Sequence, residues 1–113
     1  MPDTIFVSTA VSVTADLLND SLVENSISGQ LIDQYSISRT DGTRIEVLVF
    51  EKHYMRADNR LTLTVTIDDF EGKTRVHFVG GGGGEGIFRF DWGAANSFEG
   101  SLLEALSEHI IQL

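Results

Sequence analysis

Six glycines and one glutamate fill the seven positions from Gly80 to Gly86, and this tract is the first place to look for chemistry. Successive backbone N–H groups in a glycine-rich loop can converge on a phosphate. A phosphate loop, however, ends in Gly-Lys-Ser/Thr and enters a helix, and a dinucleotide fingerprint also joins a strand to a helix. This tract contains Glu85, is followed by no lysine and connects two strand-like segments. The pattern therefore favours a bulged or mobile connection between strands over a nucleotide site.

The side chains around this tract are the ones best suited to bind a small molecule. If residues 80–86 form a flap that orders over a ligand, they would gate a pocket between a sheet and the helices that cover it. The pattern includes no nucleophile beside a general base, so we assign no catalytic residue and no cofactor and lean against an enzyme. The candidate ligand-binding residues are His77, Gly81, Gly82, Gly83, Glu85, Arg89 and Trp92.

The acidic and imidazole side chains do not form a metal-binding pattern. Glu51 and His53 lie two residues apart at the end of the predicted strand 43–52, where they would either share a metal or a proton or simply lie in solvent. Asp68, Asp69 and Glu71 crowd one turn, but their spacing does not match a calcium-binding loop, so we expect a solvated turn. The sequence has no cysteine, which excludes thiolate ligands. We predict no metal site.

The charge of the chain argues against several classes of partner. Its 113 residues include 17 Asp and Glu but 8 Lys and Arg, which gives a net charge of −9. Nucleic acids and anionic membrane surfaces attract clusters of basic residues, and the basic residues here are scattered. No apolar run approaches the roughly 18 residues of a membrane span, and the first residues do not resemble a signal peptide. We therefore expect a cytoplasmic protein that binds neither nucleic acid nor membrane.

The first part of the chain combines a loosely alternating segment with a helical one. Residues 4–13 alternate between apolar and hydroxyl side chains, as a short edge strand or an extended lead-in would. From 15 to 27, apolar residues recur at steps of three and four, which predicts an amphipathic helix. Thr14 is placed to cap the N-terminus of this helix, and Gly29 to follow its C-terminus in a left-handed conformation.

The middle of the chain alternates with the period of two that is typical of strands. Asp41-Gly42 lies between two such segments and predicts a hairpin with a two-residue type I′ turn. The clearest alternation places Leu61, Leu63, Val65 and Ile67 on one side and threonines on the other. The predicted strands are 31–39, 43–52, 61–68, 74–79 and 87–92.

The last part of the chain, residues 97–112, has the apolar stripe of a second helix, with Asn96 as its N-cap and Glu99 completing a capping box. No repeat or linker divides the chain, so residues 1–113 are expected to form one domain. The simplest arrangement that buries these apolar faces is a two-layer α+β fold. In it, a four- to five-stranded, mostly antiparallel meander sheet packs against an N-terminal and a C-terminal helix.

Two stretches of the sequence carry a resemblance to known proteins. These stretches are FEKHYMRADNRLTLTVTI and FVGGGGGEGIFRFDWGAANSFEGSLLEAL. They resemble small uncharacterised bacterial proteins that are grouped as a domain family of unknown function. The resemblance covers most of the chain and implies a compact α+β domain. It implies no activity, and no catalytic residues transfer with it.

Two functions fit these observations. The first is a non-enzymatic module that binds a protein partner or forms a homodimer through a face or an edge of its sheet, because segments 43–52 and 87–92 have partly apolar second faces. The second is a small-molecule-binding protein or enzyme whose pocket is gated by Gly80–Gly86. A strict monomer at high concentration would count against self-association. Uniformly absent ligand-induced stabilisation would count against the pocket.

Overall fold

The computed structural model describes residues 3–26, 28–54, 59–82 and 92–112. These segments contain five strands, two α-helices and a π-helical turn, η1, that follows the first helix directly. In chain order the elements are β1 (Asp3–Val7), α1 (Val11–Asn19), η1 (Asp20–Glu24), β2 (Gly29–Ser38), β3 (Arg44–Tyr54), β4 (Asn59–Asp68), β5 (Thr74–Gly82) and α2 (Trp92–Ala105).

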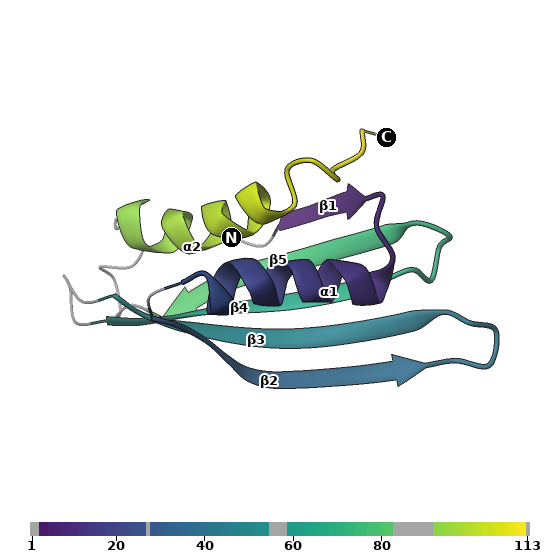
Figure 1. Cartoon of the computed structure of the whole chain (residues 1–113), viewed down its shortest axis with the longest axis horizontal. Coiled ribbons are helices and arrows are strands. Elements are labelled where there is room, and N and C mark those ends of the chain that lie inside the picture. Colours follow the sequence, from purple (N-terminus) through teal and green to yellow (C-terminus); the bar gives the residue numbers. More distant parts are fainter. Residues whose placement is uncertain (1–2, 27, 55–58, 83–91, 113) are drawn as a thin grey trace.

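The strands form one antiparallel sheet in the order β1-β5-β4-β3-β2. Strands β2 to β5 follow one another as a meander, whereas β1 pairs with the far side of β5 (Figure 1). The chain must therefore pass from one edge of the sheet to the other between β1 and β2, and α1 lies on this path. The two-layer α+β fold with a mostly antiparallel meander sheet is confirmed.

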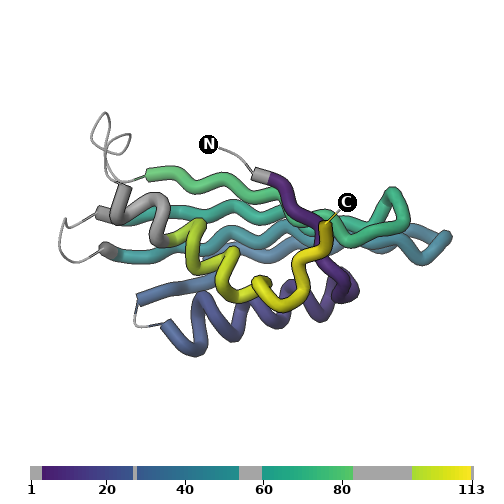
Figure 2. Tube along the Cα trace, turned by 90° about the horizontal axis from the view of Figure 1, so that it is seen from above, coloured from purple at the N-terminus to yellow at the C-terminus, as the bar shows by residue number. Residues whose placement is uncertain are grey.

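Both helices lie on the same side of the sheet, which is clear when the molecule is viewed from above (Figure 2). The core fills the space between the helices and this face. The four inward residues predicted for β4 are all buried, with at most 1% of their surface exposed. Burying an apolar side chain of this size contributes roughly 1.5–3 kcal/mol. The core consists of Val7, Val11, Ala15, Leu18, Leu22, Leu48, Phe50, Leu61, Leu63, Val65, Ile67, Val76, Phe78, Phe98, Leu102 and Leu106.

Helix α1 begins at Val11, earlier than the predicted start at residue 15. Val11, Ala15 and Leu18 are all buried, so the helical stripe already includes Val11. Thr14 is not the N-cap as predicted, because it lies within the first turns of the helix. Its Oγ1 donates a hydrogen bond to the carbonyl oxygen of Ala10, the residue at the N-cap position, at 2.8 Å.

Gly29 begins β2 and does not end the helix in a left-handed conformation, contrary to the prediction. Its N–H donates a hydrogen bond to Ser26 Oγ at 3.1 Å. A Cβ at this position would overlap the carbonyl oxygen of Leu22 in η1. The close approach of two backbone segments therefore explains the glycine, and a positive φ does not.

The β2–β3 hairpin closes with a loop of three residues, so the predicted two-residue turn is wrong in length. The Arg39 N–H donates to the Thr43 carbonyl oxygen at 2.8 Å, and the Gly42 N–H donates to the Arg39 carbonyl oxygen at 3.0 Å. Gly42 has a φ of +94°, the left-handed conformation that such loops require at their last position. The carboxylate of Asp41 accepts hydrogen bonds from the Thr43 N–H at 3.0 Å and from the Thr43 hydroxyl at 2.6 Å.

Helix α2 begins at Trp92, earlier than the predicted start at residue 97. Residues 87–91 of the predicted last strand lie outside the described residues, and Trp92 is helical instead of extended. Asn96 lies inside α2, so it is not the N-cap. Glu99 does not complete the predicted capping box. Its Oε2 instead accepts a hydrogen bond from the Gly80 N–H at 3.0 Å, which links α2 to β5.

The two edges of the sheet differ. The C-terminal residues run along the outer side of β1, where the Ser8 N–H donates to the His109 carbonyl oxygen at 2.8 Å and the Ile111 N–H donates to the Phe6 carbonyl oxygen at 2.9 Å. In the described segments, no strand pairs with the outer side of β2. In these segments one edge of the sheet is therefore covered at its Phe6–Ser8 end, whereas the other edge is open.

Candidate functional site

The face of the sheet turned away from both helices, the open face, is built from alternate residues of each strand. Antiparallel sheets with one side in water usually carry polar residues on that side. Strand β4 follows this rule with threonines, whereas β3 presents isoleucine and valine. The side chains on the open face include Thr4, Phe6, Tyr35, Ile37, Ile45, Val47, Val49, Thr62, Thr64, Thr66, Arg75, His77 and Val79.

Five apolar side chains of β2 and β3 form a continuous row on the open face, the β2–β3 strip, which consists of Tyr35, Ile37, Ile45, Val47 and Val49. Tyr35 pairs with Val47, and Ile37 pairs with Ile45. Tyr35 is 57% exposed and Ile37 is 44% exposed, so the strip is most accessible at the β2 side. Neighbouring exposed apolar side chains of this kind are typical of interaction sites.

The hydrogen bonds of the hairpin define which backbone groups of β2 point outward. Because the Arg39 N–H bonds toward β3, the alternation of an antiparallel pair directs the N–H and C=O groups of Ile37 and Tyr35 toward β3 as well. The backbone groups of the residues between them therefore point away from the sheet. These outward residues are Gln34, Ser36 and Ser38, and all three are exposed.

Strand β2 lacks most of the features that protect edge strands from pairing. Its sequence GQLIDQYSIS contains no Pro, Lys or Arg, and its single charged side chain is Asp33. A bulge shifts the register between Leu31 and Asp33, but the pairing is regular from Asp33 to Ser38. We take this regular outer edge of β2 together with the β2–β3 strip as the candidate interaction surface.

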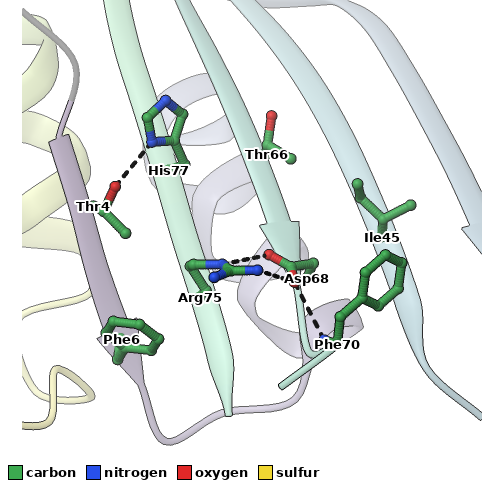
Figure 3. A pocket seen from close by; sticks show the side chains of 8 residues that line it. All are labelled: Thr4, Phe6, Ile45, Thr66, Asp68, Phe70, Arg75 and His77. Carbon is green, nitrogen blue, oxygen red and sulfur yellow. Dashed lines mark hydrogen bonds and ion pairs between the residues drawn. The ribbon is translucent and has the colours of Figure 1, made fainter. Parts of the chain in front are cut away.

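A cavity of about 570 Å³ opens on the open face, at the end of the sheet where β4 leads into β5 (Figure 3). Phe6, Ile45 and Phe70 provide its apolar sides. The Oγ1 of Thr4 and the Nδ1 of His77 form a hydrogen bond of 2.9 Å across β1 and β5. The cavity is lined by Thr4, Phe6, Ile45, Thr66, Asp68, Phe70, Arg75 and His77.

The ion pair between Asp68 and Arg75 also lines this cavity. Arg75 Nε donates to Asp68 Oδ1 at 3.0 Å, and Nη2 donates to Oδ2 at 2.9 Å, while Nη1 lies 3.2 Å from Glu71 Oε1. The hydrogen bonds and charge of Asp68 raise the pKa of Arg75 above its usual value. Asp68 is 6% exposed, so the prediction of a solvated turn is wrong for this residue. Since two carboxylates already neutralise the guanidinium, the cavity does not favour an anion at Arg75.

The residues predicted to bind a ligand are not gathered in one described site. His77 lies on the open face, in the cavity of Figure 3. Gly81 shares that face further along β5, and Gly82 ends the strand with a φ of +86°. Trp92 begins α2, which lies on the opposite side of the sheet. Gly83, Glu85 and Arg89 lie outside the described residues.

Within the described ranges, no three acidic, imidazole or thiol side chains come together in a way that would hold a metal ion. The carboxylate of Glu51 instead accepts a hydrogen bond from Arg60 Nη1 at 3.0 Å, as part of an exposed ion pair. Such exposed pairs contribute little to stability. None of the helices in these ranges is long and apolar enough to cross a membrane.

The sequence reasoning missed the outer edge of β2. One signal was present, because the segment 31–39 has no basic residue or proline before Arg39 and carries apolar residues on both sides. The lack of these residues indicates an accessible edge only when the segment is known to lie at the edge of a sheet. The position at the edge depends on β1 joining the sheet beside β5, which no local pattern shows.

The comparison with curated proteins gave no match, and neither did the comparison with solved structures. A family model does match, and it spans residues 6–110. This range includes the sheet edge formed by β2, the β2–β3 strip and nearly all of the cavity lining. Because the match covers almost the whole chain, the protein belongs to a family of unknown function, DUF6054, as the resemblance in its sequence predicts.

Proposed function

We propose that this domain is a non-enzymatic protein-interaction module that binds a partner by adding a strand to the outer edge of β2. The observation that supports the proposal is the contrast between the two edges of the sheet. C-terminal residues bond to the Phe6 carbonyl oxygen of β1 and to the N–H of Ser8, which follows β1. On β2, no described strand pairs with the outward groups of the exposed residues Gln34, Ser36 and Ser38.

Strand addition at this edge would combine two sources of affinity. The outward N–H and C=O groups of β2 would form a new antiparallel or parallel ladder with the partner strand. The β2–β3 strip would contribute apolar contact, since Tyr35 and Ile37 stand beside that ladder with about half of their surface exposed (57% and 44%). Backbone bonds alone would not select a partner, so the exposed side chains of β2 would set the specificity.

The charge of the molecule limits the classes of partner. With a net charge of −9, the domain repels the phosphates of nucleic acids and the headgroups of anionic membranes. We therefore propose a protein partner, and a cytoplasmic location, which the lack of cysteine also favours.

A fluorescent peptide with the sequence of residues 30–39 tests whether this edge accepts a strand. We expect saturable binding of the peptide to the folded chain, measured by fluorescence anisotropy at low protein concentration. Ser36→Pro should abolish binding, because the proline removes an outward N–H and leaves the bonds toward β3 in place. The control Leu103→Ser changes an exposed apolar side chain of α2 and should bind the peptide normally.

Two results would contradict strand addition at β2. One is the absence of peptide binding by the wild-type chain. The other is equal binding by wild type and Ser36→Pro. A second proline variant, Ile37→Pro, checks the assignment of the backbone groups, because it removes an N–H that points toward β3 and should lower the free energy of unfolding much more than Ser36→Pro.

A second candidate function is small-molecule binding in the cavity of Figure 3. It is favoured by the cavity volume of about 570 Å³, which lies within the range of roughly 300–1,000 Å³ that is usual for ligand sites. A thermal-shift screen with neutral aromatic compounds tests it, and any stabilisation should be lost in His77→Ala. A screen without stabilising compounds, or hits that are unaffected by His77→Ala, would count against this site.

A further inference from the structure

We propose that the partner strand at β2 is β2 of a second copy of this chain, paired antiparallel about a two-fold axis that passes beside Ser36. This inference rests on the proposed function and adds the identity of the partner and the register. In this register Asp33 of each copy faces Arg39 of the other. The two five-stranded sheets would then join into one continuous sheet.

The backbone of β2 fits such a symmetric pair. An antiparallel pair of identical strands is related by a two-fold axis, which makes the same patch serve both partners. The outward groups of Ser36 would bond to those of Ser36 in the second copy. The next hydrogen-bonded pairs would be Gln34 with Ser38 of the second copy and, by symmetry, Ser38 with Gln34 of the second copy.

The side chains on the open face are complementary in the same register. Tyr35 would face Ile37 of the second copy, a pairing of an aromatic with a β-branched residue that stabilises antiparallel strands. This pairing merges the two β2–β3 strips into one apolar surface. Both side chains are about half exposed in the single chain (57% and 44%), so they have surface to bury.

The charges favour this register over the one shifted toward the hairpin loop. Asp33 lies on the open face of β2, Arg39 follows the strand directly with its guanidinium 5.3 Å from the centre of the Phe70 ring, and both residues are exposed. With Ser36 on the axis, each carboxylate faces a guanidinium, which gives two symmetry-related attractive pairs. Moving the axis to Ile37 would bring Asp33 opposite Asp41 of the second copy, and like charges that are directly opposite are unfavourable.

The distribution of charge over the whole chain favours this edge for self-association. Two chains that each carry a net charge of −9 repel one another in most orientations. Strand β2 contributes one charged residue, Asp33, in the ten residues from Gly29 to Ser38. Two copies that meet along β2 therefore bring fewer like charges together than they would in most other orientations. In the register above, the Asp33 carboxylate of each copy also faces the Arg39 guanidinium of the other.

Charge reversal of the full chain tests the proposal, with sedimentation equilibrium as the measurement. Wild type should form a reversible dimer. Asp33→Arg and Arg39→Asp should each weaken dimerisation by about tenfold, because each change turns two attractive pairs into two repulsive ones. An equimolar mixture of the two variants should recover wild-type affinity, because the mixed dimer has an Arg–Asp pair at both positions.

Two controls keep the result specific. The Arg39 guanidinium lies 5.3 Å from the centre of the Phe70 ring, so Arg39→Asp also removes a contact within the chain. Recovery on mixing separates this local effect from the pairing between copies. Glu104→Arg on α2 changes the net charge by the same amount as Asp33→Arg at another exposed position, and it should leave the dimer unchanged.

Three outcomes would overturn the inference. The first is a wild-type chain that stays monomeric at its highest soluble concentration. The second is unchanged dimerisation of both single variants, and the third is weakened variants that fail to recover on mixing. If the wild-type chain is monomeric but still binds the peptide of residues 30–39, strand addition stands and the second copy is excluded as the partner. If the chain is monomeric and the peptide does not bind, both proposals fail.

Discussion

Two glycines of this chain stand in opposite environments. A Cβ at Gly29 would overlap the Leu22 carbonyl oxygen, whereas a Cβ at Gly100 in α2 would meet no atom within 4 Å. We predict that Gly29→Ala lowers the free energy of unfolding by about 1–3 kcal/mol through overpacking. Gly100→Ala should raise it by about 0.5–1 kcal/mol because alanine favours a helix. Urea denaturation of both variants measures these changes, and equal effects of the two substitutions would contradict the assigned environments.

The carboxylate of Asp41 links stability to pH. The hydrogen bonds from the Thr43 hydroxyl and N–H lower the pKa of Asp41 below its ordinary value of 3.8. A group whose pKa is lowered by folding stabilises the protein above its unfolded pKa and loses this contribution as the pH falls through the folded pKa. We therefore predict that wild type is more stable than Asp41→Asn at pH 7 and that this difference shrinks below about pH 4. Urea denaturation across this range measures the difference, and a difference that grows on acidification would contradict the prediction.

Single residues show what the sequence can and cannot predict. The inward positions of β4 can be predicted from the sequence alone. Successive side chains of a strand point to opposite faces, and the large apolar residues of this segment occupy every second position. The roles of Asp68 and Glu99 could not be predicted from the local sequence pattern, because each of these side chains bonds to a residue of another element. Asp68 is buried by its pairing with Arg75, and Glu99 accepts a hydrogen bond from the N–H of Gly80.

At the scale of elements, the types of the helices and strands were easier to predict than their ends. Helix α1 starts at Val11 and α2 at Trp92, in both cases earlier than the capping residues suggested. Tertiary contact explains the early start of α1, since the buried Val11 extends the apolar face of the helix beyond Thr14. In the β2–β3 hairpin, the positive φ of Gly42 agrees with the predicted type I′ turn, but the three-residue loop does not, because its length depends on how Arg39 and Thr43 bond.

The C-terminal segment is an element-scale feature whose contribution can be measured. The Ile111 N–H donates to the Phe6 carbonyl oxygen on β1. We predict that Ile111→Pro lowers the free energy of unfolding by about 1 kcal/mol, because it removes this donor and leaves the carbonyl without it. Gln112→Pro, at the exposed next position, is the matched control and should have little effect. Equal urea midpoints for wild type and Ile111→Pro would contradict the role assigned to this bond.

At the scale of the whole molecule, the fold class was predictable and the sheet order was not. Alternating segments between two amphipathic helices permit few other ways to bury their apolar faces, so the two-layer arrangement follows from the sequence. The placement of β1 beside β5 requires a contact between segments about seventy residues apart, such as that of Ile5 with Val76. For the same reason the candidate interaction surface could not be located before the strand order was known.

The covering of β1 by residues 109–111 has a consequence for the size of any assembly built on this sheet. A filament needs an unoccupied edge on each side of every subunit, so that each addition leaves a place for the next. Among the described residues, a chain that pairs through β2 has its other edge covered around Val7, because the Ile111 N–H donates to the Phe6 carbonyl oxygen and the Ser8 N–H donates to the His109 carbonyl oxygen. This cover hinders a further addition at β1, so the arrangement favours a finite pair of subunits over a fibre.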